Sequence, residues 1–201
     1  MLDPDVIQRA LTRHPRRTLE IADLRPAAVI LPLFVKDGVD HVLFTRRTET
    51  LRHHRGEISF PGGAYQPSDG SRLQAALRET EEEMGIAAQD ITVLGKLDDV
   101  ASVHGYHVVP FVGSYPYPYP YRVNADEIAE VIELPLERLR DPAVFRTEEW
   151  RHQGRLHPVY FYTVDEYVIW GLTARILHQF LGRVFTAKSA DGISCGSDVT
   201  P

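Results

Sequence analysis

The sequence predicts an α/β protein, with several strands, one helix near the middle of the chain and one late. Apolar runs of strand length, bounded by turn residues, recur between residues 27 and 163. Two segments, 71–84 and 168–184, instead carry apolar residues at the 3.6-residue spacing of a helix. A chain of 201 residues with 43% apolar residues can bury a sizeable core, so we expect a single domain.

The N-terminal part is predicted to form a short helix and a β-hairpin. Residues 4–13 have helical character, and Asp3 is placed to cap their N-terminus. The run 27–35 is almost wholly apolar, as expected of a strand covered on both faces. The Asp-Gly pair at 37–38 is a hairpin turn signal, and 41–45 is predicted to be the returning strand.

A glycine pair and an acidic helix occupy the middle of the chain. Gly62 and Gly63 precede a helix predicted over 71–84, which Gly85 ends. Residues three and four apart are neighbours on a helix, so one face is predicted to carry Glu79, Glu82 and Glu83. The opposite side is predicted to be a core stripe made of Leu73, Leu77, Thr80 and Met84.

These three glutamates repel one another, so a positive group is expected to offset their charge. Arg78 lies four residues before Glu82 and can neutralise it in part. Hard divalent cations bind carboxylate oxygens, water and substrate phosphates, so the acidic face also suits such a cation. An isolated cluster of this kind is more often a solvated helix face than a cation site. The neighbouring sequence is needed to distinguish these two interpretations.

Residues 46–60 show neither helical nor strand periodicity over most of their length, and they carry a local excess of positive charge. The charged and titratable residues are Arg46, Arg47, Arg52, His53, His54 and Arg55, against Glu49 and Glu57. One interpretation is a solvated loop of long side chains. The other is an anion site beside the acidic helix, because the planar arginine fork donates two hydrogen bonds at once to phosphate.

The stretch from Gly63 to Ile86 resembles the Nudix box, whose pattern is Gly, five residues, Glu, seven residues, then Arg-Glu-hydrophobic-x-Glu-Glu-x-Gly-hydrophobic. The second half matches at Arg78, Glu79, Glu82, Glu83, Gly85 and Ile86. Thr80 stands at a usually apolar position, Asp69 replaces the first Glu, and one extra residue separates Asp69 from Arg78. These departures leave the metal-binding turn untouched.

The stretch from Leu43 to Gly63 resembles the signature that precedes the box in coenzyme A pyrophosphatases. That signature reads Leu-Leu-Thr-x-Arg-Ser/Ala, three residues, Arg, three residues, Gly, three residues, Phe-Pro-Gly-Gly. The matching positions are Leu43, Thr45, Arg47, Arg52, Gly56, Phe60, Pro61, Gly62 and Gly63. Phe44 and Thr48 depart mildly from it, and the extra residue inside the box is typical of the same subfamily.

Beyond the box, short apolar runs alternate with turn residues. Strands are predicted over 91–97 and 106–112, and the polar loop between them, 98–105, could overhang a substrate. Alternate prolines over 115–121 favour an extended backbone between four tyrosines. This segment is interpreted as a stiff surface loop, or as an aromatic wall against the adenine or pantetheine part of a ligand.

The segment 124–133 combines an apolar stripe with acidic residues, and a short helix is predicted from Pro135 to about residue 139. Nudix proteins often contribute a further acidic residue from this region to metal or water, which makes Glu127 and Glu130 candidates. The alternative is a strand with polar outer residues.

The last part of the chain is predicted to be a strand pair and a helix. The pair covers 146–151 and 158–163, and a core-packing helix follows over 168–184. The stretch 169–174, Ile-Trp-Gly-Leu-Thr-Ala, also resembles the coenzyme A pyrophosphatase subfamily. Residues 187–201 are expected to form a polar, disordered tail. The Nudix domain is therefore expected to span 1–186, with 1–25 as a helical lead-in.

The resemblance implies a Nudix α/β/α sandwich with a mixed β-sheet between helices. It also implies metal-dependent hydrolysis of the diphosphate linkage of coenzyme A, or of an acyl form. The products would be 4′-phosphopantetheine, or its acyl derivative, and adenosine 3′,5′-bisphosphate. The glycine pair would let the backbone approach the helix and the diphosphate. Arg47 and Arg52 would bind substrate phosphate.

The resemblance also implies a role for each acidic residue. Glu79 and Glu83 would be the principal ligands of Mg²⁺ or Mn²⁺. Glu82 would complete that shell or act as general base, with Arg78 orienting it, and Glu127 is the further catalytic candidate. The alternatives are a Nudix hydrolase for ADP-ribose, NADH or an oxidised nucleotide, and a non-catalytic Nudix-like sensor. Sensors commonly lack one or more of the box carboxylates, which are all present here.

Composition limits the remaining classes of partner. A net charge of −6 does not predict a broad nucleic-acid or anionic-membrane surface. The single cysteine, Cys195, rules out an internal disulfide framework. No apolar run reaches the roughly 20 residues of a membrane span, and no secretory signal is evident. A cytoplasmic enzyme is therefore expected, with a small-molecule substrate, and a homodimer is left open.

Overall fold

A computed structural model describes the chain except for residues 1, 14, 22, 50–55, 153 and 186–201. The predicted tail, with Cys195, lies outside the described residues, as do Arg52, His53, His54 and Arg55. The helices are α1 (Pro4–Thr12), α2 (Arg72–Met84), α3 (Leu136–Leu139) and α4 (Gly171–Phe185). No helix in the described part of the chain is long and apolar enough to cross a membrane.

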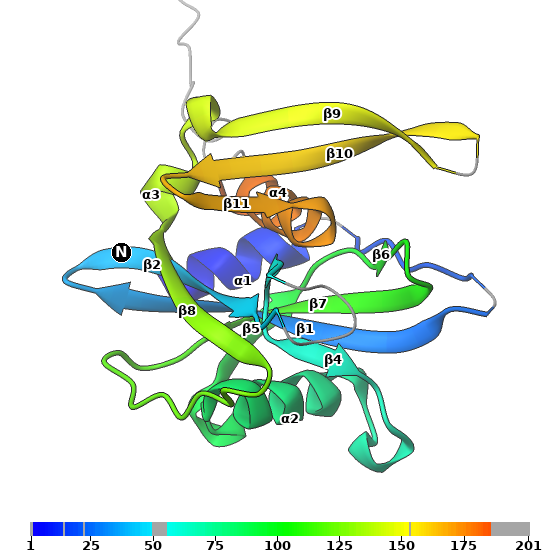
Figure 1. Cartoon of the computed structure of the whole chain (residues 1–201). Helices are drawn as coiled ribbons and strands as arrows, with labels where there is room; N and C mark the ends of the chain where they lie inside the picture. The colour runs from blue at the N-terminus through cyan, green and yellow to red at the C-terminus, as the bar shows by residue number, and fades with distance from the viewer. Residues whose placement is uncertain (1, 14, 22, 50–55, 153, 186–201) are drawn as a thin grey trace, which may run out of the picture.

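A mixed β-sheet forms the centre of the molecule, which confirms the predicted α/β fold class (Figure 1). Its strands are β1 (Arg25–Lys36), β2 (Val39–Arg47), β3 (Ile58–Ser59), β4 (Gly62–Ala64), β5 (Thr92–Lys96), β6 (Val100–Ala101), β7 (Tyr106–Ser114) and β8 (Ile128–Pro135). Strands β1 and β7 run parallel, in register from the pair Arg25 and Tyr106 to the pair Leu33 and Ser114. The other pairs are antiparallel, including the predicted hairpin of β1 and β2.

Strand β1 has two antiparallel neighbours on the same side, and this arrangement places the glycine pair. Its C-terminal half pairs with β2, from Leu33 opposite Val42 to the turn. Its N-terminal half pairs with β4, with Ala28 opposite Gly63. Strand β3 continues along β2 where β1 has turned to β4. The β3–β4 segment is thereby held against the sheet beside α2.

A second, antiparallel sheet packs beyond the helices α1 and α4, so that these helices lie between the two sheets (Figure 1). It consists, in the described residues, of β9 (Phe145–His152), β10 (Arg155–Val164) and β11 (Tyr167–Trp170). The strand pair predicted over 146–151 and 158–163 is confirmed. The helix predicted from residue 168 begins instead at Gly171, because 168–170 pairs with β10. A short apolar run fits both periods, and only the pairing partner decides between them.

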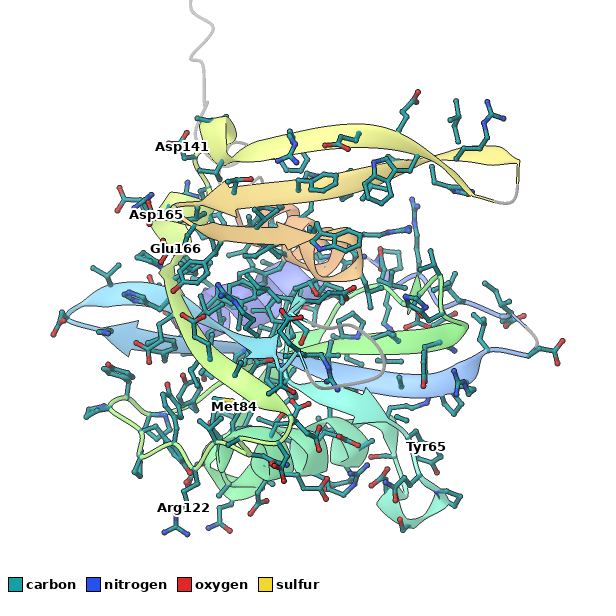
Figure 2. The ribbon with its side chains drawn as sticks, in the orientation of Figure 1. Tyr65, Met84, Arg122, Asp141, Asp165 and Glu166 are labelled. Atoms are coloured by element: carbon teal, nitrogen blue, oxygen red, sulfur yellow. The ribbon has the colours of Figure 1, made fainter. Side chains whose placement is uncertain are left out.

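The apolar core is divided by the central sheet. One part packs α1 and α4 against the sheet and includes Leu11, Phe44, Ile132, Ile176 and Phe180. The other packs α2 against the opposite face and includes Ala28, Phe34, Leu77, Met84 and Phe111. Met84 points from α2 toward the sheet in Figure 2. The acidic helix is therefore anchored through one apolar face.

Local chemistry sets the ends of the predicted helices. Asp3 caps α1 by accepting a hydrogen bond from the Asp5 N–H at 2.8 Å. Ser71 caps α2 by accepting from Gln74 N–H at 3.2 Å. Gly85 ends α2 in the left-handed conformation, with a φ of 70°. The sequence predicted these roles for Asp3 and Gly85, whereas Ser71, expected within the helix, is its N-cap and α2 begins at Arg72.

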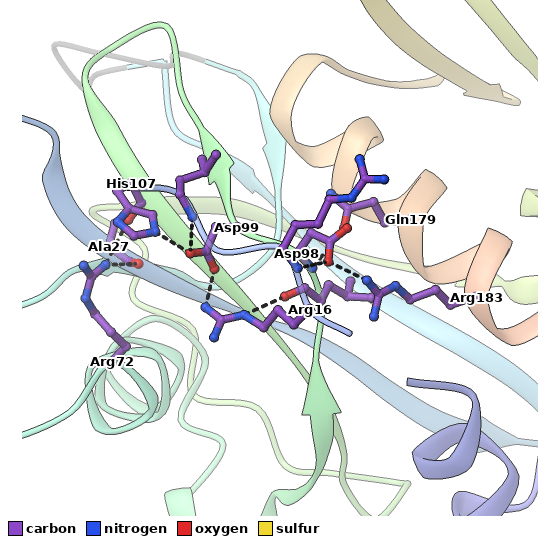
Figure 3. Close-up of polar contacts among 11 residues, drawn as sticks. Arg16, Ala27, Arg72, Asp98, Asp99, His107, Gln179 and Arg183 are labelled. Atoms are coloured by element: carbon purple, nitrogen blue, oxygen red, sulfur yellow. Dashed lines mark hydrogen bonds and ion pairs between the residues drawn. The ribbon is translucent and has the colours of Figure 1, made fainter. Parts of the chain in front are cut away.

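The loop 98–105 begins with two aspartates that fasten distant segments together (Figure 3). Asp98 accepts hydrogen bonds from Arg17 N–H and from the guanidinium of Arg183 on α4. The Asp99 carboxylate, whose side chain is 1% exposed, contacts Arg16, His107 and the Leu19 N–H. These contacts tie the segment after α1 to the sheet, and β6 lies within the same loop.

The charge of Asp99 contributes to stability. Burial raises its pKa, but hydrogen bonds from His107, Leu19 N–H and Arg16 outweigh burial, so the pKa is lowered in the folded protein. A lowered pKa means that the carboxylate stabilises the fold above its ordinary pKa. This stabilisation is lost as the pH falls through the lowered value.

We expect Asp99→Ala to destabilise the protein by about 2 to 3 kcal/mol near pH 7, because it leaves Arg16 and His107 without their shared carboxylate. Denaturant unfolding measures this, and the deficit should shrink as the pH is lowered below the carboxyl range. Arg138→Ala breaks the exposed ion pair with Asp165 and is the control, with an expected change under about 0.5 kcal/mol. Equal losses from both variants would contradict the assignment.

Candidate functional site

Glu83 is the most deeply buried acidic residue of α2. Only 3% of it is exposed, although the sequence placed it on a face opposite the core stripe. Its carboxylate accepts a hydrogen bond from Gly62 N–H at 3.2 Å and lies 3.7 Å from Nη1 of Arg47. Burial raises the pKa of Glu83 to about 8, against the opposing effects of Gly62 N–H and Arg47, while Glu79 and Glu127 raise it further. The expected opposite-face placement is thus wrong for Glu83.

Glu79 lies one turn before Glu83 and is half-buried. Burial raises its pKa, Arg78 opposes this, and the charges of Glu82 and Glu127 add to it. A Cβ on Gly63 would lie 2.5 Å from the carboxyl carbon of Glu79, so the absence of a side chain at residue 63 gives this carboxylate its position. The two predicted principal metal ligands are therefore brought together beside β4.

Gly62 meets a different constraint from Gly63. Its φ is 145°, and a Cβ there would lie 2.4 Å from the Ala28 carbonyl oxygen and 2.6 Å from Val29 Cα. The collision is with backbone, which cannot move aside as a flexible side chain can. Gly62 thus allows the backbone to turn its N–H toward Glu83.

Arg78 forms ion pairs with several acidic residues of the box. Its guanidinium contacts Asp69 at 2.7 Å and both Glu79 and Glu82 at 2.9 Å, and it also donates to the Ala64 carbonyl at 3.3 Å. The Arg78 hydrogen bond is the main reason that the pKa of Asp69 is lowered. Asp69, left without a role by the sequence, therefore orients Arg78. The separation of Asp69 and Arg78 within the box was the sequence signal that could have indicated their contact.

Glu82 differs from the other two predicted ligands. Its side chain is 58% exposed, and its described partner is Arg78, four residues earlier. The sequence grouped all three glutamates on one face, but the fold buries Glu83, half-buries Glu79 and leaves Glu82 at the rim. Thr80, at the usually apolar position, is fully buried and donates its hydroxyl to the Ala76 carbonyl at 2.7 Å.

The segment before β8 brings Glu127 to the same place. Arg122 N–H donates to the Met84 carbonyl and Asn124 N–H to the Glu83 carbonyl, both at 2.9 Å, so this segment caps the C-terminus of α2. Figure 2 shows Arg122 beside that end of the helix. Glu127 follows, partly buried, and its charge raises the pKa of both Glu79 and Glu83.

Glu130, the other acidic candidate of this region, lies elsewhere. It accepts a hydrogen bond from the Tyr167 hydroxyl at 2.8 Å and pairs with Arg46 Nε at 3.3 Å. Both partners are on the side of the central sheet that faces β11. The structure thus separates Glu130 from the acidic cluster and leaves Glu127 as the residue of this pair that joins it.

The predicted phosphate-binding arginines are described only in part. Arg47 approaches Glu83, and within the described part of the chain its buried Nε has no hydrogen-bond partner. Arg52 lies outside the described residues. A buried guanidinium nitrogen without a partner is costly, and an anionic ligand would satisfy it.

The carboxylate oxygens of this cluster have the chemistry that Mg²⁺ and Mn²⁺ select. Among the described residues, no three histidine, cysteine or acidic side chains are already arranged as a cation site. Arg78 and Gly62 N–H hold the glutamates in the arrangement described above instead. The charge of Glu127 nevertheless raises the pKa of both Glu79 and Glu83, and Glu79 also raises the pKa of Glu83, so a cation would relieve this repulsion. The donor set therefore fits a hard divalent cation.

The tyrosine-proline segment packs against protein. Tyr117 stacks on Phe34 with ring centroids 4.9 Å apart, and the Tyr119 hydroxyl donates to Asp90 at 2.7 Å. The Tyr115 and Tyr121 hydroxyls bond each other at 2.6 Å. These contacts fasten the segment between β1 and the end of α2, as the stiff-loop interpretation predicts. The aromatic-wall interpretation has no support from the described contacts.

Comparisons with known proteins give one family. The NUDIX domain family matches residues 23–153. A Photorhabdus laumondii protein named "Uncharacterized Nudix hydrolase NudL" is 41% identical over 90% of this chain and 96% of its own. A protein of the same name from Escherichia coli K12 is 37% identical over 87% and 91%. The solved MutT/nudix family protein from Enterococcus faecalis superposes on 95% of this chain and 75% of its own at a TM-score of 0.50 and 15% identity, which shows the fold alone.

We expect Gly63→Ala to weaken Mn²⁺ binding at least about 10-fold, because the new Cβ displaces the Glu79 carboxylate. Its stability should change by less than about 1 kcal/mol, since the displaced atoms end a flexible side chain. Calorimetric titration and denaturant unfolding measure the two effects. Gly182→Ala, which meets no atom within 4 Å, is the control and should bind Mn²⁺ normally. Wild-type binding by Gly63→Ala would show that this close approach is unimportant.

Proposed function

This chain belongs to the NUDIX domain family, and from that premise we propose that it hydrolyses the diphosphate linkage of coenzyme A or an acyl-coenzyme A. The products would be 4′-phosphopantetheine, or its acyl derivative, and adenosine 3′,5′-bisphosphate. The coarser activity is that of a Nudix hydrolase on a nucleoside diphosphate derivative. In this proposal residues 1–186 form one Nudix hydrolase domain, because α1 packs against both α4 and β5.

One observation carries the proposal: the carboxylates of Glu79, Glu83 and Glu127 gather beside the Gly62 N–H and the Arg47 guanidinium. The cluster combines acidic groups for a cation with one donor for an anion, the Arg47 Nε that has no described partner. A diphosphate bound through a divalent cation needs both kinds of group. Neither a purely structural ion pair nor a solvated acidic face would leave Arg47 Nε buried without a described partner.

Glu79 and Glu83 would hold Mg²⁺ or Mn²⁺, with Glu82, exposed and paired to Arg78, the weaker third candidate. The bound cation would supply Lewis-acid stabilisation of the diphosphate and lower the pKa of a bound water. Arg78 holds Glu79 in place, and Asp69 holds Arg78.

Among the candidate proton acceptors, the geometry favours Glu127 over Glu82. Glu127 is partly buried beside both ligand candidates, and its described side-chain partner is the neutral amide of Asn124 at 3.4 Å. Glu82 is exposed at the rim, and Arg78 already engages its carboxylate in an ion pair. We therefore assign proton transfer from water to Glu127.

Coenzyme A is favoured because residues of the coenzyme A pyrophosphatase signature fix the chain near Arg47. Phe60 stacks on Phe44 with centroids 4.9 Å apart, and the Pro61 carbonyl accepts from Ile30 N–H at 2.9 Å. These contacts fix the backbone that leads from β3 to the glycine pair. Arg47, and Arg52 by the sequence resemblance, would contact substrate phosphate, including the 3′-phosphate of coenzyme A.

The proposal is tested by a substrate panel of coenzyme A, acetyl-coenzyme A, dephospho-coenzyme A, ADP-ribose and NADH, with Mg²⁺ or Mn²⁺ added and withheld. Products are identified by mass. We expect kcat/KM to be at least about 10-fold higher for coenzyme A than for dephospho-coenzyme A, because each charge-assisted contact contributes about 1.5 to 3 kcal/mol. Preference for ADP-ribose or NADH would replace the coenzyme A assignment, and absence of turnover on every substrate would favour a ligand sensor.

Glu83→Gln keeps the size of the side chain and removes its charge. We expect kcat on coenzyme A to fall by at least about 100-fold at saturating Mg²⁺, since even residues behind metal ligands are worth 10- to 100-fold. Glu81→Gln is the matched control, because Glu81 is exposed on the same helix and accepts a hydrogen bond from Ala88 N–H. Turnover of Glu83→Gln near the wild-type rate would remove Glu83 from the ligand set.

A further inference from the structure

Residues 122–127 cross the C-terminal end of α2 and lead into β8, and Asn124 is the centre of their contacts. The Asn124 N–H donates to the Glu83 carbonyl at 2.9 Å. Its carbonyl accepts hydrogen bonds from Glu127 N–H at 3.1 Å and from Ile128 N–H at 2.9 Å. The backbone of this one residue therefore links a proposed cation ligand to the proposed proton acceptor.

The Asn124 side chain uses both ends of its amide. Its Oδ1 accepts from Asp126 N–H at 3.2 Å, which closes a local turn, and its Nδ2 donates to Oε1 of Glu127 at 3.4 Å. An ionised aspartate at this position could supply only the acceptor. The amide therefore shapes the turn and holds the Glu127 carboxylate at the same time.

This contact orients Glu127 without neutralising it. The Asn124 amide is uncharged, unlike the guanidinium that pairs with both Glu79 and Glu82. A carboxylate has about four lone-pair positions, and one amide N–H leaves most of them free for the proton of a water. A general base needs both a fixed direction and a free lone pair, so a neutral partner suits Glu127.

The other end of the turn is fastened to the chain that follows β2. Thr48 N–H donates to the Glu127 carbonyl at 2.9 Å, and the Thr48 hydroxyl donates to the Asp126 carbonyl at 3.1 Å. These contacts hold the backbone of Glu127 but leave the torsions of its side chain open. Fixing a glutamate side chain costs rotamer entropy. Within the described part of the chain, the Asn124 amide supplies the hydrogen bond that fixes it.

We propose that Asn124 is a positioning residue for the hydrolysis: its amide directs the Glu127 carboxylate, and its N–H holds the turn against Glu83. Asn124 acts through Glu127 and contacts neither the cation nor the substrate. This inference rests on the proposed function, in which Glu127 takes the proton from water. A purely structural Asn124 that only shapes the turn into β8 is the competing outcome of the test.

Asn124→Ala removes the amide and keeps the backbone contacts. We expect kcat on coenzyme A at saturating Mg²⁺ to fall about 10-fold with KM within about 2-fold, because the direction of Glu127 matters only in the transition state. Asn124→Ser keeps an oxygen that can accept from Asp126 N–H but has no amide donor, so its kcat should fall as far. Wild-type kcat in Asn124→Ser would show that the residue only shapes the turn. Val123→Ala, at the neighbouring 36% exposed residue, is the control and should keep its kcat within about 2-fold.

A double-mutant cycle shows whether Asn124 acts through Glu127. Glu127→Gln should lower kcat by at least about 100-fold. Adding Asn124→Ala should lower it less than about 2-fold further, because the carboxylate to be directed is gone. Losses that multiply would overturn the inference. Mn²⁺ affinity of Asn124→Ala, measured by calorimetric titration, should stay within about 2-fold of the wild type, and a 10-fold loss would mean that Asn124 positions Glu83 instead.

The outcomes separate this inference from the proposed function. Wild-type kcat in Asn124→Ala, together with an inactive Glu127→Gln, would overturn the inference alone. Turnover of Glu127→Gln near the wild-type rate would overturn the assignment of Glu127 and the inference with it. If the wild type prefers another substrate of the panel, the coenzyme A assignment fails and the same cycle on that substrate decides the inference. Absence of hydrolysis on the whole panel would overturn both.

Discussion

The burial of the Glu83 carboxylate beneath the central sheet is the constraint on which the site depends. A buried carboxylate is costly unless hydrogen bonds and charges compensate it. Here the compensation comes from Gly62 N–H and from Arg47, which belong to two different strand segments. Gly62 can supply that N–H only because it lacks a side chain that would strike the backbone of β1. The contacts of Glu83 with Gly62 and Arg47 therefore fix α2, β4 and the end of β2 relative to one another.

Around Glu83, the charged residues form an outer group and an inner group. Asp69 holds Arg78, and Arg78 in turn holds Glu79 and Glu82, so one guanidinium neutralises much of the outer acidic surface. The inner groups, Glu83 and Glu127, are not neutralised by Arg78. Residual negative charge is thus concentrated beside the glycine pair, where Gly62 N–H donates to Glu83. Carboxylates in this arrangement suit a hard divalent cation.

Strand β2 separates two sets of polar contacts. Arg47 contacts the acidic helix on one side of the central sheet, and Arg46 contacts Glu130 and the Tyr167 ring on the other. The β9–β11 sheet supplies Tyr167, whose hydroxyl donates to Glu130 on β8, so this sheet contributes more than cover for α4.

Patterns within single elements were sufficient for much of this protein. The N-cap of α1, the glycine that ends α2, the β1–β2 hairpin, the glycine pair and the acidic turn all follow from local geometry, because spacing fixes neighbours on a helix and glycine allows the chain to turn. The mixed sheet between helices followed from the resemblance of two motifs.

Tertiary structure decided what depends on a partner from another element. Spacing placed Glu79, Glu82 and Glu83 together, but packing against β4 and β2 selected Glu83 for burial and left Glu82 exposed. Likewise, Tyr167 and Arg46 drew Glu130 away from the cluster, and pairing with β10 made 168–170 a strand. Burial and charge compensation are properties of contacts between distant segments. The sequence of each segment therefore determined which residues could act in the candidate site, and the fold determined which of them lie there.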